Sequence, residues 1–141
     1  MQRRTFLRTL ACAAAALGAG AARADEGLVV IANEPLRGID ADLLKRIYTG
    51  RAIEANGQAL RPVNLPSTAA LRQRFLTSVL QQADADYVAY WTVRRYVGKG
   101  APPPEVASAA DVIAYVQRTP GGMGYIDAAD LKPGLNVVWR R

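Results

Sequence analysis

Two adjacent hydroxyl side chains and a nearby arginine are the residues of this sequence whose types and spacing best suit chemistry. Ser67 and Thr68 follow Pro66 at a predicted helix start, and Arg72 comes one helical turn after Thr68. A helix start presents free backbone N–H groups and the positive end of the helix dipole, which together favour a bound anion. The pattern therefore predicts a site for a small oxyanion formed by Ser67, Thr68 and Arg72. The alternative interpretation is structural: Ser67 caps the helix, and the arginine lies on a solvated face.

The residue types on which most enzymes and zinc sites depend are missing. The sequence has no histidine and one cysteine, Cys12, so the usual nucleophile–base pairs and the usual zinc ligands cannot be assembled. Asp40 and Asp111 stand where helix caps are expected, and no glycine-rich phosphate loop follows a strand. We therefore expect a binding protein, not an enzyme, with no cofactor and no metal.

Residues 1–24 have the pattern of a cleavable signal peptide. Three arginines lie among the first eight residues, residues 10–17 are apolar, and Ala22-Arg23-Ala24 has the form of a cleavage site. The apolar stretch is too short and too rich in alanine for a transmembrane helix. We expect residues 25–141 to form one domain in the periplasm, without stable membrane insertion. Arg3-Arg4 resembles the start of a twin-arginine (Tat) signal, and the general secretory (Sec) route is the alternative.

The net charge changes when the signal peptide is set aside. The whole chain has 18 basic and 12 acidic residues, a net charge of +6. Residues 1–24 contain four of the arginines and no acidic residue, which leaves 14 − 12 = +2 for the rest. A nucleic-acid-binding domain needs a dense basic face, so we expect no nucleic-acid partner.

Strands and helices alternate along the predicted domain. Continuous apolar runs predict buried strands, apolar residues at helical spacing predict helices, and Asp40 and Ser108 are the expected caps. The predicted strands are 28–32, 60–64, 123–126 and 135–139, and the predicted helices begin near residues 41, 67, 84 and 109. This order favours an α/β domain with a mixed, mostly parallel sheet.

Three segments resemble the phosphate-type periplasmic substrate-binding proteins, which have the type 2 periplasmic-binding-protein fold. Residues 28–51 end in Ile47-Tyr48-Thr49-Gly50-Arg51, similar to the family's Ile-Phe-x-Gly-Lys. The segment Val63–Phe75 is similar to the one that carries the family's phosphate-binding Ser-Gly-Thr loop. Residues 119–125, Thr-Pro-Gly-Gly-Met-Gly-Tyr, resemble Thr-Pro-Gly-x-Ile-Gly-Tyr. The resemblance implies a three-layer α/β lobe, a role in transport, and phosphate or another small oxyanion as the ligand.

The sequence departs from this family in two respects. Family members have two lobes in a chain more than twice as long, so this chain matches a single lobe. Counting back from Phe75 places Ala69, Ala70 and Leu71 on the Ser-Gly-Thr positions, and Arg72 directly after them. An alanine cannot replace a hydroxyl that donates a hydrogen bond to an oxyanion.

Two functions remain open from the sequence. The first is a periplasmic domain related to the substrate-binding proteins of phosphate ABC transporters, with an oxyanion at Ser67, Thr68 and Arg72. The second is an interaction module of the same fold that binds no ligand and docks on a membrane sensor or transporter. A protein-docking face would leave Trp91, Tyr96 and Trp139 exposed, whereas the helical spacing of Trp91 favours core packing.

Overall fold

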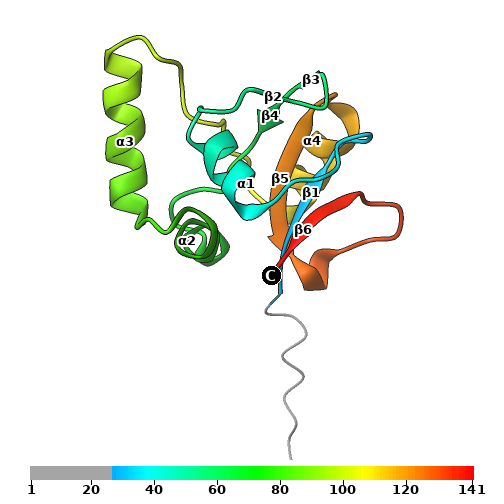
Figure 1. The fold of residues 1–141 in the computed structure, drawn as a ribbon. Helices are drawn as coiled ribbons and strands as arrows, with labels where there is room; N and C mark the ends of the chain where they lie inside the picture. Colours follow the sequence, from blue (N-terminus) through cyan, green and yellow to red (C-terminus); the bar gives the residue numbers. More distant parts are fainter. Residues whose placement is uncertain (1–26) are drawn as a thin grey trace, which may run out of the picture.

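The chain folds around a four-stranded mixed sheet in the order β4-β5-β1-β6. The computed structural model describes residues 27–141, so the predicted signal peptide lies outside the described residues. The strands of this sheet are β1 (Leu28–Ala32), β4 (Arg61–Pro62), β5 (Gly122–Asp127) and β6 (Val137–Arg140). A separate hairpin joins β2 (Glu54–Ala55) to β3 (Gln58–Ala59) at Asn56-Gly57, a dipeptide whose sequence predicts a tight turn. Figure 1 shows β1 and β5 side by side at the centre of the sheet.

The prediction of a mostly parallel sheet is wrong. The central strand β1 pairs antiparallel with both β5 and β6, and the one parallel pairing of this sheet joins β4 to β5. The prediction depends on the alternating order of strands and helices along the sequence, whereas β1 itself is a continuous apolar run that is buried along its whole length. Such a run indicates that both faces of the strand are covered. It does not indicate whether the neighbouring strands run parallel or antiparallel.

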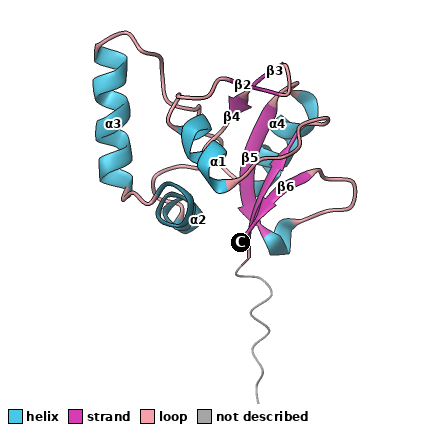
Figure 2. Cartoon of the chain, in the orientation of Figure 1, coloured by secondary structure: helices cyan, strands magenta, loops and turns pink. Residues whose placement is uncertain are grey.

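Helices cover the sheet from both sides (Figure 2). The predicted caps of two of them are confirmed. Asp40 accepts a hydrogen bond from the Leu43 backbone N–H at 2.7 Å, and Ser108 accepts one from Asp111 at 3.3 Å. The helical segments are α1 (Ala41–Tyr48), α2 (Ala70–Phe75), the π-helix η2 (Leu76–Leu80), α3 (Asp84–Tyr96), α4 (Ala109–Arg118) and the 3-10 helix η3 (Ala128–Asp130).

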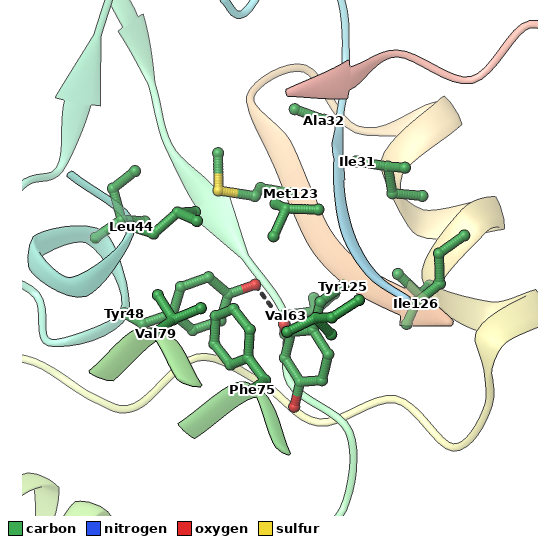
Figure 3. Close-up of a cluster of buried hydrophobic side chains, with 14 of the residues drawn as sticks. Ile31, Ala32, Leu44, Tyr48, Val63, Phe75, Val79, Met123, Tyr125 and Ile126 are labelled. Atoms are coloured by element: carbon green, nitrogen blue, oxygen red, sulfur yellow. Dashed lines mark hydrogen bonds between the residues drawn. The ribbon is translucent and has the colours of Figure 1, made fainter. Parts of the chain in front are cut away.

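The core is divided by β5, whose alternate residues face different helices. A side chain at Gly124 would point at Val112 of α4, and its neighbours in β5 therefore face the other side. On that side Tyr125 stacks on Phe75, with ring centroids 4.1 Å apart and planes 8° from parallel. Tyr48 meets the edge of the same phenylalanine at 4.7 Å (Figure 3). This aromatic cluster ties α1 and α2 to the sheet.

Gly124 packs directly against Val112 of α4, and this gives a testable prediction. An added Cβ would lie 2.5 Å from Val112 Cγ1 and 3.2 Å from Val63 Cγ2. We expect Gly124→Ala to lower the free energy of unfolding by about 1–3 kcal/mol, the usual cost of overpacking, as measured by urea denaturation.

The matched test of this clash is the double variant Gly124→Ala/Val112→Ala. Removing the Val112 methyl groups frees the space that the new Cβ needs. The loss in the double variant should then be smaller than the sum of the two single losses by about 0.5 kcal/mol or more. Additive losses would contradict a direct clash between these two positions.

Candidate functional site

Side chains from α3 donate hydrogen bonds to backbone carbonyl groups at the C-terminal end of α1. Tyr87 Oη and Trp91 Nε1 both donate to the Tyr48 carbonyl, at 2.9 and 3.2 Å. Tyr90 Oη donates to the Thr49 carbonyl at 2.7 Å. The last carbonyl groups of a helix lack partners within the helix, so these donors satisfy groups that would otherwise need water. One face of α3 is thereby fixed against α1.

Arg72 lies beside this junction and is bound to two carboxylates. Its Nε donates to Asp84 Oδ1 at 2.7 Å, and its Nη1 donates to Glu105 Oε1 at 2.8 Å and to the Leu65 carbonyl at 2.9 Å. The arginine is 3% exposed, whereas the side chains of Asp84 and Glu105 are 23% and 51% exposed. The guanidinium also lies over the Tyr87 ring, 5.6 Å from its centroid. Two carboxylates therefore more than neutralise this buried positive charge.

A network of neutral groups adjoins the arginine. Asn64 Oδ1 accepts from Tyr125 Oη at 2.8 Å, and Asn64 Nδ2 donates to Tyr87 Oη at 3.1 Å. The Leu65 N–H donates to Tyr125 Oη at 3.1 Å. Burial raises the pKa of the Tyr87 and Tyr125 phenols. The hydrogen bonds of these phenols and the nearby Arg72 charge lower the pKa, but by less. Both tyrosines therefore stay protonated at neutral pH, and the network keeps its hydrogen bonds without a change of charge.

A pocket of about 460 Å³ opens next to this cluster. It combines the polar groups of Asn64, Arg72 and Glu105 with apolar side chains, and Arg95 is a further cation in its lining. The apolar lining comes from α3 and from the three consecutive prolines, and consists of Tyr87, Val88, Trp91 and Pro102 to Pro104. Such a mixture of aromatic, proline and paired polar groups suits a small, largely uncharged group.

The structure separates the three residues predicted to bind an oxyanion. Ser67 and Thr68 lie in an exposed turn, closed by a 2.9 Å hydrogen bond from the Ala69 N–H to the Pro66 carbonyl. Helix α2 begins only at Ala70, and its cap residue Ala69 has no hydroxyl. The prediction that Ser67 caps this helix is therefore wrong. Arg72 lines the pocket, whereas the two hydroxyl residues do not.

The partners of Arg72 were not found from the sequence. Asp84 stands at the start of a predicted helix, and Glu105 follows the three prolines in a segment too short to predict a strand or helix. One signal was present: Arg72 occurs within the apolar stripe of α2, next to Leu71 and one turn before Phe75. A charged residue on a buried face needs an ionic or hydrogen-bonded partner, but its identity depends on contacts 12 and 33 residues away.

The aromatic residues expected on a docking face differ in exposure. Trp91 is 5% exposed, which confirms its expected core packing, whereas Tyr96 is 92% exposed and Trp139 is half-buried. The helical spacing of α3 also predicts that Val88 is buried, but Val88 is 46% exposed and lines the pocket. Over residues 27–141, no helix is long and apolar enough to cross a membrane. The same residues contain no cluster of three acidic, histidine or cysteine side chains placed to hold a metal.

The fold is that of an α/β domain and resembles part of a transport receptor. A solved structure that shares the fold is an ABC-type phosphate transport receptor from Vibrio cholerae, with a TM-score of 0.61 and 16% sequence identity. The match covers 79% of this chain and 45% of the receptor, so the chain spans less than half of the receptor's length. Neither a protein-family model nor a curated protein sequence matches the chain.

Proposed function

We propose that the chain is exported and that residues 25–141 act in the periplasm as a single three-layer lobe of the type 2 periplasmic-binding-protein fold. The lobe is neither an enzyme nor a cofactor-dependent protein. It acts as an interaction module that docks on a membrane transporter or sensor and does not enclose a solute. The fold shared with a phosphate transport receptor supports the receptor-like class.

The pairing of Arg72 carries this proposal. A cation that binds phosphate must offer donors and net positive charge to the ligand. Arg72 already donates three hydrogen bonds, two of them to carboxylates. An incoming oxyanion would meet the negative charges of Asp84 and Glu105, or would have to displace one of them.

The second candidate is a small-oxyanion-binding domain that uses Ser67, Thr68 and Arg72, with phosphate as the first ligand to consider. Two observations favour it: the two hydroxyl side chains are exposed next to the start of α2, and the structural neighbour is a phosphate transport receptor. In this version Glu105, the more exposed of the two carboxylates, moves aside when the anion enters.

Isothermal calorimetry on the exported protein separates the two candidates. Titration with inorganic phosphate, sulfate and acetate up to millimolar concentration should release no heat of binding if the lobe is an interaction module. Saturable heat that disappears in Ser67→Ala/Thr68→Ala would overturn this proposal and establish the oxyanion site. Thr77→Ala is the matched control, because it removes an exposed hydroxyl residue from the adjoining helix.

A further inference from the structure

A second pocket borders the segment that contains the three prolines, and we call it the Tyr115 pocket after the α4 residue in its lining. It shares Trp91 and residues 101–104 with the pocket beside Arg72, but Arg72 and Glu105 do not line it. Its volume is about 300 Å³, at the lower end of the range for small-molecule sites. Most of its remaining lining is apolar and consists of Ile47, Ala52, Ile53, Leu60 and Pro62.

Two polar side chains, those of Arg61 and Tyr115, also line the Tyr115 pocket. Within residues 27–141, the exposed guanidinium of Arg61 has no ion-pair partner and no hydrogen-bond partner. The Tyr115 hydroxyl makes no hydrogen bond to any residue that the structure describes. The pocket therefore presents a cation and a hydroxyl group that are both available to a ligand, unlike the saturated Arg72.

The charge around the Tyr115 pocket is positive. Arg118 lies over the Tyr115 ring, 5.8 Å from its centroid. Burial raises the pKa of the Tyr115 phenol, and the positive charges of Arg61 and Arg118 partly offset this rise. The phenol is therefore protonated at neutral pH and can donate a hydrogen bond. Glu54 follows Ile53 in the chain but is exposed and outside the lining, and no other acidic residue of the described chain lines the pocket.

We propose that the Tyr115 pocket binds a small organic acid that has an apolar body and a single carboxylate. The carboxylate binds at Arg61 and Tyr115, and the apolar body packs against side chains such as Leu60 and Trp91. The planar guanidinium offers two parallel N–H donors, which match the two oxygens of a carboxylate. A dianion such as phosphate carries more charge than the one arginine in this mostly apolar lining compensates.

The apolar side chains at the pocket select an acid with a hydrocarbon body. Ile53 lines the pocket and is 75% exposed, so it offers apolar surface that a ligand can cover. Each methylene group that becomes buried strengthens binding by about fourfold. An acid with several methylene groups should therefore bind more tightly than acetate, which has none.

This inference goes beyond the proposed function and does not depend on it. Ser67, Thr68 and Arg72, the residues of the oxyanion candidate, do not line the Tyr115 pocket. A domain that docks on a transporter or sensor can therefore bind an organic acid at this second position. The variant Ser67→Ala/Thr68→Ala should leave binding at the Tyr115 pocket unchanged.

Isothermal calorimetry of the exported protein with hexanoate tests the pocket. Hexanoate should bind saturably with a dissociation constant below about 1 mM. Hexanamide has the same hydrocarbon chain without the charge, and it should bind about tenfold more weakly or worse, because it cannot pair with Arg61. Acetate has the same charge without the methylene groups, and it should also bind about tenfold more weakly or worse.

Two variants, each with a matched control, assign the binding to this pocket. Arg61→Gln should weaken hexanoate by about tenfold, whereas Arg140→Gln, which removes an exposed arginine from the opposite edge strand of the same sheet, should bind like the wild type. Ile53→Ala should also weaken hexanoate. Its control is Val93→Ala, which shortens an exposed apolar side chain outside the pocket. Because Arg61, Ile53 and both control residues are exposed, the four variants should keep the melting temperature of the wild type within a few degrees.

Three results would each overturn the inference. They are the absence of saturable heat with hexanoate, equal affinities for hexanoate and hexanamide, and equal affinities of Arg61→Gln and Arg140→Gln for hexanoate. None of these results alters the test of the proposed function, which uses phosphate and sulfate and depends on Ser67 and Thr68.

Discussion

Replacing Arg72 with methionine is expected to lower the free energy of unfolding by about 3 kcal/mol, measured by urea denaturation. The guanidinium holds together three parts of the chain through its bonds to the Leu65 carbonyl, Asp84 and Glu105. Removing one partner of a buried ion pair leaves the others without compensation, which costs about 3–5 kcal/mol. The lower end of that range applies because Glu105 is half-exposed and regains water.

Two further variants make this expectation specific. Arg118→Met removes an arginine that is exposed in the last turn of α4 and lies over the Tyr115 ring, so its loss should be below about 1 kcal/mol. The triple variant Arg72→Met/Asp84→Asn/Glu105→Gln removes the unpaired charges together with the arginine. It should recover part of the stability lost in Arg72→Met. Equal losses in Arg72→Met and Arg118→Met would contradict a structural role for the ion pairs.

The stability of Arg72→Met also decides which variants can be used to test ligand binding. Arg72 is buried and bonded to three separate segments of the chain, through the Leu65 carbonyl, Asp84 and Glu105. If its loss unfolds the domain, a loss of binding in the Arg72→Met variant says nothing about ligand contact. The hydroxyl residues Ser67 and Thr68 are therefore the informative positions for the oxyanion candidate, because both are exposed.

Local features of the fold could be predicted from the sequence. The Asp40 and Ser108 caps, the Asn56-Gly57 turn and the strand around Tyr125 depend on residues within a few positions of one another. Such interactions leave a readable pattern in the sequence. The same reasoning predicted α3 and the burial of Trp91 from helical spacing.

The predictions that were wrong concern features that depend on contacts between distant segments or on competing local turns. The direction of β5 against β1 is set by how the chain returns after α4, which no local pattern records. The turn that starts at Pro66 closes before α2 begins, so the hydroxyl residues that follow this proline lie outside the helix that they were expected to cap. The carboxylates that bind Arg72 come from two other segments. Of the residues predicted for the site, Arg72 lines the pocket and Ser67 and Thr68 do not, and the other residues of the pocket did not follow from the sequence.

The largest expected effect of a single added methyl group is at Gly121, where we expect Gly121→Ala to lower the free energy of unfolding by about 2–5 kcal/mol. This glycine has a φ of +76°, and a Cβ built on it would overlap the Ala59 carbonyl oxygen. Its own carbonyl accepts a 2.8 Å hydrogen bond from the Arg61 N–H, next to the pairing of β4 with β5. The backbone conformation alone costs an alanine about 1–2 kcal/mol, and overpacking against fixed backbone adds about 1–3 kcal/mol.

Gly134→Ala separates the two contributions. Gly134 has a similar φ of +87°, but nothing lies within 4 Å of an added Cβ. This variant should therefore lose only the conformational part, about 1–2 kcal/mol, and should melt cooperatively in circular dichroism. Gly121→Ala should show a far lower melting temperature or no cooperative transition. Gly121 connects α4 to β5. Equal losses of stability in Gly121→Ala and Gly134→Ala would mean that the β3–β4 segment moves aside and that this edge of the sheet is not fixed against β5.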